Sequence, residues 1–157
     1  FLTVHSAATL SQEEHQTFAG MQSGDKLQIL GHGLPGAPFV YDRAEAGGAE
    51  ISMRELALRL KSHQLPDVRL QIILKGCHTA DASMPGDHAG GWFRPKTLAP
   101  AQSLRNELRK QGYRKVEVVG FHGAGLPWGF IHDAGSHHVR DVGGKVVRGQ
   151  AARQVFR

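Results

Sequence analysis

Two short motifs combine glycine with a reactive side chain, and each follows an apolar segment. His32 lies between Gly31 and Gly33, after residues 26–30. Cys77, the single cysteine, follows residues 68–75 and a glycine. A thiol is nucleophilic as its thiolate, and an imidazole can take its proton and later protonate a leaving group. The motifs therefore predict nucleophilic catalysis by Cys77, with His32 as its proton-transfer partner.

The segments before these motifs are expected to be buried parallel strands. Residues 26–30, 68–75 and 115–120 are short apolar runs without strict alternation, and residues 2–4 form a candidate fourth strand. The carboxyl ends of parallel strands meet at one edge of a sheet, where ligands and catalytic groups gather. His32, Cys77 and the motif around His122 should therefore converge there.

Three helices are expected between the strands. Ser11 and Ser52 are each followed three residues later by glutamate, a capping-box pattern that predicts helices to about residues 21 and 62. A third helix is expected over residues 98–111, ended by Gly112. The alternation predicts an α/β fold, with a central, mainly parallel sheet flanked by helices on both faces.

The glycine-rich parts of the chain are expected to be loops, hairpins and a ribbon. Residues 33–51 and 79–96 should form long loops or hairpins next to the strand ends. Gly143 and Gly144 predict a hairpin turn, and residues 137–156 a β-ribbon or flap beside the sheet. Residues 1–157 are interpreted as one domain, which begins with Phe1 and is expected to be excised from a longer chain.

The sequences LQILGHG at 27–33 and LQIILKGCHTA at 70–80 resemble motifs of the caspase, gingipain and clostripain group of cysteine peptidases. They are most similar to the self-cleaving cysteine protease domains of large bacterial toxins and effectors. The resemblance covers residues 26–120, with the histidine before the cysteine and the helix after Ser52 between them. His78 departs from it, because small or apolar residues are usual after the cysteine.

The resemblance implies a caspase-hemoglobinase-like fold and peptide-bond hydrolysis through a Cys–His dyad. It also implies an oxyanion hole built from the backbone N–H groups of Gly33 and Cys77. The expected partner is a protein or peptide substrate, including the parent chain. The residues leave localisation open, whereas the resemblance suggests a secreted bacterial effector or toxin that acts in a host cytosol.

A polyanion is the one activator that the resemblance implies, and the thiol chemistry itself requires no cofactor. In the toxin domains, inositol hexakisphosphate binds a basic surface and orders a β-ribbon next to the active site. Alternatively, basic residues only discourage edge-to-edge pairing of an exposed ribbon. The C-terminal segment offers five candidate phosphate ligands: Arg140, Lys145, Arg148, Arg153 and Arg157.

Two other functions remain open from the residues alone. One is a zinc site, since zinc accepts histidine and cysteine ligands, although the chain has no HxxxH or CxxC pair. The other is a catalytically silent binding domain on the same fold. In the peptidase interpretation, Asp81 or Asp87 can orient a histidine or line the specificity pocket, and the residues leave the choice between them open. The candidate zinc ligands are His32, Cys77, His78 and His122, with His132, His137 and His138 nearby in sequence.

Composition limits the remaining partners. The 157 residues are 40% hydrophobic, enough for one domain with a core that needs no disulfide. No apolar run is long enough to span a membrane. The formal net charge of +5 favours polyanions, but aromatic residues make up 7% of the chain and form no stacking motif, so a nucleic-acid partner is disfavoured.

Overall fold

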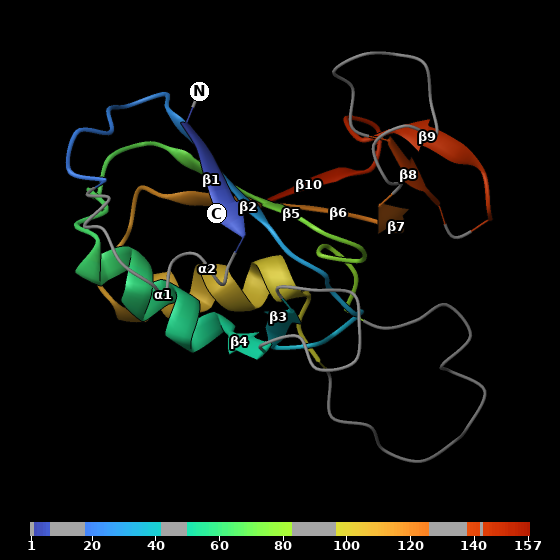
Figure 1. Cartoon of the computed structure of the whole chain (residues 1–157), viewed down its shortest axis with the longest axis horizontal. Coiled ribbons are helices and arrows are strands. Elements are labelled where there is room, and N and C mark those ends of the chain that lie inside the picture. Colours follow the sequence, from blue (N-terminus) through green and yellow to red (C-terminus); the bar gives the residue numbers. More distant parts are fainter. Residues whose placement is uncertain (1, 7–17, 42–49, 83–96, 126–137, 142) are drawn as a thin grey trace.

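A computed structural model describes residues 2–6, 18–41, 50–82, 97–125, 138–141 and 143–157. Five strands form its central sheet in the order β1-β2-β5-β6-β10 (Figure 1). The first four are parallel, and β10 pairs with β6 in the antiparallel sense. The predicted α/β class with a mainly parallel sheet is confirmed. The strands are β1 (Leu2–Ser6), β2 (Lys26–Leu30), β5 (Gln71–Lys75), β6 (Glu117–Phe121) and β10 (Arg153–Phe156).

The strands bury alternate residues rather than all of them. The β2–β5 register pairs Leu27 with Ile72 and Ile29 with Leu74, and all four side chains are completely buried on one face. Their neighbours along the strands are exposed or half-buried. The expectation of strands buried equally on both faces is therefore wrong for β2 and β5. Apolar residues fill one face, and the opposite face carries mixed side chains.

Both helices of the described residues lie side by side on the fully buried face (Figure 1). Helix α1 (Met53–Ser62) connects β2 to β5, and α2 (Pro100–Lys110) precedes β6. Parallel crossovers are right-handed, so successive crossovers that move across the sheet in one direction put their helices on the same face. The prediction of helices on both faces is therefore wrong for the part of the chain that the structure describes.

The ends of the helices follow from their sequences. The Ser52 side chain accepts a hydrogen bond from the Glu55 N–H at 3.1 Å, which caps α1. After α2, Gly112 adopts a φ of 100°, where a side chain is disfavoured. Both helices pack through apolar residues on one face: Met53, Leu56, Ala57 and Leu60 in α1, and Ala101, Leu104 and Leu108 in α2.

The structure describes the first predicted helix and the two predicted loops only in part. The helix expected from Ser11 lies mostly outside the described residues, and residues 18–21 at its expected end form a turn. Residues 33–51 contain a hairpin of β3 (Phe39–Tyr41) and β4 (Glu50–Ser52), as the glycine and proline content indicated. Most of the second predicted loop, residues 83–96, lies outside the described part.

A second, three-stranded antiparallel sheet lies beyond the carboxyl end of β6 (Figure 1). It consists of β7 (Ala124–Gly125), β8 (His138–Arg140) and β9 (Val146–Arg148), with the predicted glycine turn between β8 and β9. Val139 packs in a small core with Val119 and Phe121 of β6. The predicted ribbon is therefore right for the β8–β9 hairpin and wrong for residues 153–156, which form β10 of the central sheet.

Candidate active site

His32 and Cys77 lie at the carboxyl edge of the central sheet, just beyond two neighbouring strands. The last paired residues of β2 and β5 are Leu30 and Lys75. The pairing extends one residue further, because the Gly31 N–H donates to the Lys75 carbonyl oxygen at 3.0 Å. The two predicted catalytic residues therefore follow strands that are hydrogen-bonded to one another.

The turns that carry these residues are in direct contact through their glycines. A Cβ atom on Gly33 would lie 2.4 Å from the carbonyl oxygen of Cys77, and one on Gly76 would lie 2.5 Å from that of Gly31. Both distances are far below van der Waals contact, so only glycine permits this approach. The His-Gly turn and the Gly-Cys turn thus pack backbone against backbone.

The backbone of His32 is fixed from its other side by the β3–β4 hairpin. Its N–H donates to the Tyr41 carbonyl at 2.8 Å, and its carbonyl accepts from the Tyr41 N–H at 2.9 Å. The imidazole is exposed and has no hydrogen-bond partner among the described residues. The His32 imidazole is therefore carried by a hydrogen-bonded backbone and is open to solvent.

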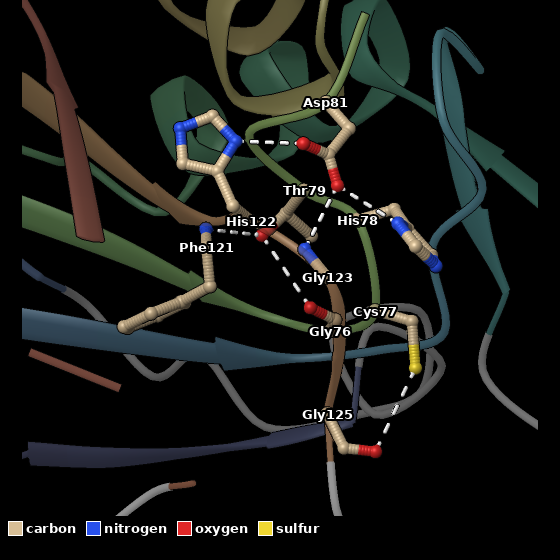
Figure 2. Close-up of polar contacts among 9 residues, drawn as sticks. All are labelled: Gly76, Cys77, His78, Thr79, Asp81, Phe121, His122, Gly123 and Gly125. Carbon is tan, nitrogen blue, oxygen red and sulfur yellow. Dashed lines mark hydrogen bonds and ion pairs between the residues drawn. The ribbon is translucent and has the colours of Figure 1, made fainter. Parts of the chain in front are cut away.

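The thiol of Cys77 lies between the first turn after β5 and strand β7. Its Sγ is half-buried and lies 3.9 Å from the carbonyl oxygen of Gly125, a long contact that sulfur donors can make (Figure 2). The backbone N–H groups of Gly33 and Cys77 donate no hydrogen bond to any described residue. Within the described part of the chain, neither N–H group is therefore occupied by an acceptor.

Asp81 forms hydrogen bonds with two other histidines, His78 and His122. The sequence had left open whether Asp81 or Asp87 orients a histidine. The Oδ2 atom of Asp81 lies 2.8 Å from His78 Nδ1 and accepts from the Gly123 N–H at 2.9 Å, while its Oδ1 lies 2.6 Å from His122 Nδ1 (Figure 2). An ionised carboxylate only accepts, so both imidazoles donate from Nδ1. Asp81 thus orients His78 and His122, and the other candidate, Asp87, lies outside the described residues.

The charge of Asp81 is stabilised by these contacts. Burial alone would raise its pKa, but the hydrogen bonds from Gly123, His122 and His78 outweigh that effect and lower the pKa below its usual value. The side chain is 14% exposed. The Asp81 carboxylate therefore ties the turn after Cys77 to the turn between β6 and β7.

Thr79 adds a buried hydrogen-bonded link between β5 and β6. This role was not predicted from the sequence. The Thr79 hydroxyl is completely buried, donates to the Leu74 carbonyl at 3.0 Å and accepts from the Phe121 N–H at 2.9 Å. His78 beside it has a φ of 55°, in the left-handed region. A threonine after Cys77 carries no local signal of this role, because both of its partners belong to strands.

The described residues provide no complete set of ligands for the zinc site that the sequence left open. That part contains no group of three or more His, Cys, Asp or Glu side chains arranged to hold a metal ion. His78 and His122 share Asp81 instead. His132 and His137 lie outside the described residues, and His138 belongs to β8.

The five predicted polyanion ligands belong to two different sheets. Arg140, Lys145 and Arg148 lie in the β8–β9 hairpin, whereas Arg153 and Arg157 lie in β10 and just after it. Arg153 donates to Gln71 at 2.8 Å and Arg157 to Glu117 at 2.9 Å. Binding of inositol hexakisphosphate by these residues stays a prediction.

The fold and site together define an α/β domain with a cysteine and a histidine at the carboxyl edge of a mainly parallel sheet. Comparison with protein-family models and with curated proteins found no match for this chain. None of the helices that the structure describes is long and apolar enough to cross a membrane.

Proposed function

We propose that this chain is a cysteine peptidase of the caspase-like kind, with Cys77 as the nucleophile and His32 as its proton-transfer partner. The observation that carries the proposal is the backbone contact between the His-Gly turn after β2 and the Gly-Cys turn after β5. Such a contact serves a Cys–His dyad, because the nucleophile and the base must be held within reach of one substrate bond.

The reaction uses groups that these turns provide. The Cys77 thiolate attacks the substrate carbonyl carbon after its proton has passed to His32. The N–H groups of Gly33 and Cys77 stabilise the oxyanion, and each such donor typically contributes about 3 kcal/mol to the transition state. The C–N bond then breaks as His32 protonates the leaving amine, and water hydrolyses the thioester to release the acid and regenerate the thiol.

The surroundings of the dyad favour an extended peptide as the substrate. Leu34 follows Gly33 and is 49% exposed, so it offers an apolar contact next to His32. The exposed imidazole leaves room for a chain to approach from solvent. The resemblance to toxin domains adds that a small apolar residue such as leucine precedes the cut, and that the parent chain is itself a substrate.

Alkylation of the thiol tests the dyad directly, since Cys77 is the single cysteine and every label reports on it. We expect wild-type protein to react with iodoacetamide faster than a free thiol does near neutral pH, and His32→Ala to react more slowly. His63→Gln is the matched control, because His63 caps the end of α1 and lies outside the two turns. It should react like wild type.

Peptide cleavage tests the function itself. Cys77→Ala and His32→Ala should each abolish hydrolysis of a leucine-containing peptide library or of a longer parent chain, with unchanged circular dichroism. Activity near the wild-type level in either variant would show that the roles are assigned wrongly. An unreactive thiol together with absent cleavage would favour a silent binding domain, and about one equivalent of zinc in chelator-free protein would favour the metal site.

A further inference from the structure

A basic cavity of about 470 Å³ lies at the edge of the central sheet opposite to Cys77. It is formed where β5 and β6 begin, where β10 ends, and along the last turns of α2. Apart from Val116 and Glu117, every residue that lines it is cationic. These residues are Arg69, Arg105, Arg109, Arg114, Lys115 and Arg157.

Arg105 forms the buried wall of this basic cavity and is held rigidly. The residue is 3% exposed, and its two terminal nitrogens donate to the carbonyl oxygens of Tyr113 and Arg114 at 3.0 and 3.1 Å. The third nitrogen, Nε, has no acceptor for its N–H among the described residues. Burial lowers the pKa of Arg105 and the charge of Arg109 lowers it further, whereas two nearby carboxylates act in the opposite direction. The fold thus places a buried guanidinium in the wall of the basic cavity.

Carboxylates neutralise little of this charge. Glu117 is the single acidic residue that lines the basic cavity, and it already accepts from Gln71 and Arg157 at 2.9 Å each. The nearby Asp67 uses one oxygen for the backbone N–H groups of Arg114 and Lys115. The side chains of Arg69, Arg114 and Lys115 have no acidic partner within hydrogen-bond distance among the described residues.

We propose that the basic cavity binds a small anion that carries several phosphate groups, either as a free compound or as a lipid headgroup. Its volume lies within the usual range of ligand sites, about 300–1,000 Å³. Arginine forks bind phosphate oxygens in pairs, and an anion with several phosphates can engage more of the cations than a single phosphate can. A bound polyanion also relieves the mutual repulsion of the six cations.

This site differs from the polyanion site expected on the C-terminal ribbon, and it is independent of the proposed dyad. Arg157 is the one residue common to the two sets. The basic cavity adjoins the amino-terminal ends of β5 and β6, whereas Cys77 follows the carboxyl end of β5. The inactive variant Cys77→Ala should therefore bind the anion as well as wild type does, and binding can be tested whether or not the peptidase proposal holds.

Calorimetric titration with inorganic tripolyphosphate tests the site. The double variant Arg114→Gln/Lys115→Gln removes two exposed charges and keeps the backbone N–H groups that bind Asp67. Arg54→Gln/Lys110→Gln is the matched control, because both side chains are exposed and neither lines the basic cavity. We expect 1:1 binding that weakens with salt, a loss of at least about tenfold in the cavity variant, and wild-type affinity in the control.

Three results would overturn the proposal: no saturable binding by wild type, equal affinity for sulfate at matched ionic strength, or a loss in the control variant as large as in the cavity variant. Thermal unfolding without ligand checks that both variants are folded. Flotation with phosphatidylcholine vesicles, with and without a polyphosphorylated inositol lipid, distinguishes the sources. If flotation requires this lipid together with Arg114 and Lys115, the ligand of the basic cavity is a lipid headgroup. If the protein binds tripolyphosphate but does not float with the vesicles, the ligand is a free anion.

Discussion

Removal of the Asp81 carboxylate should destabilise the protein by an amount that its contacts allow us to work out. Asp81 accepts hydrogen bonds from His78, His122 and the Gly123 N–H. The His122 side chain is 44% exposed and can turn to water, so we count nothing for it. Each of the other two donates to a charged acceptor, a contact worth roughly 1.5–3 kcal/mol. Asp81→Ala should therefore cost about 3 kcal/mol at neutral pH, taking the lower value for each.

Asp81→Asn separates the charge from the shape of the side chain. The amide oxygen can still accept from His78 and Gly123, but hydrogen bonds to a charged acceptor are roughly twice as strong as neutral ones. We therefore expect a loss of about half as much, about 1.5 kcal/mol. The free energy of unfolding should therefore be highest in wild type, lower in Asp81→Asn and lowest in Asp81→Ala. This order is specific to a carboxylate that acts through hydrogen bonds.

The effect should also depend on pH, with a sign fixed by the lowered pKa of Asp81. A carboxylate whose pKa is lower in the folded state stabilises the fold above its unfolded pKa of about 3.9. That stabilisation is lost as the pH falls further, through the pKa of the folded state. The difference between wild type and Asp81→Asn should therefore shrink below about pH 4.

Urea unfolding followed by circular dichroism measures these differences at neutral and acidic pH. For a domain of this size, 3 kcal/mol corresponds to a fall of about 6–12 °C in Tm, and the urea m-value should not change. The reasoning is refuted if Asp81→Ala loses less than about 0.5 kcal/mol at neutral pH, or if the difference does not shrink in acid. The alkylation rate of Cys77 in both variants reports whether its turn moves when the carboxylate is lost.

Three other substitutions test the glycine contact, the buried hydroxyl and the helix cap. Gly33→Ala should force the turn away from the Cys77 carbonyl, which its Cβ would approach to 2.4 Å, and should lower peptide cleavage at least tenfold, about 1.4 kcal/mol in the barrier. Thr79→Val leaves the Phe121 N–H without its buried acceptor, so urea unfolding should show a loss of about 1–3 kcal/mol. Ser52→Ala should lower the stability by about 1 kcal/mol through loss of the α1 cap.

Each of these substitutions has a matched control in the same chain. Gly20→Ala adds a Cβ with no atom within 4 Å and should leave cleavage unchanged. Thr79→Ser keeps the hydroxyl and should recover most of the stability lost in Thr79→Val. Ser52→Asp replaces one good N-cap by another and should be close to wild type. A Gly33→Ala variant with full activity would contradict the proposed contact, and a stable Thr79→Val would contradict the role of the hydroxyl.

The sequence was sufficient to predict features that depend on local patterns. Apolar runs located β2, β5 and β6, although β5 and β6 begin later than expected, and the capping serine fixed the start of α1. The neighbourhood of His32 and Cys77 followed from two parallel strands that exit at one edge. In each case a short stretch of residues contains the whole signal.

Features that depend on distant partners could not be predicted in this way. Strand β10 has the sequence RQVF, too short and polar to indicate a place in the central sheet, and it is a strand because it pairs with β6. The common face of the helices follows from the strand order, which no local pattern encodes. The role of Asp81 depends on His122, which lies 41 residues further along the chain.

Strands that pair in the sheet lie far apart along the chain, and this separation affects when the site forms during synthesis. The side-chain bond between Gln71 and Glu117 joins residues 46 positions apart, and Cys77 meets Gly125 across 48 positions. Contacts between such distant residues form slowly, because a large loop must close before any of them contributes. During synthesis, Cys77 therefore leaves the ribosome well before β6 and β7, and for that interval the thiol lacks its contact with β7. The surroundings of the thiol are therefore complete only after both of these strands have been made.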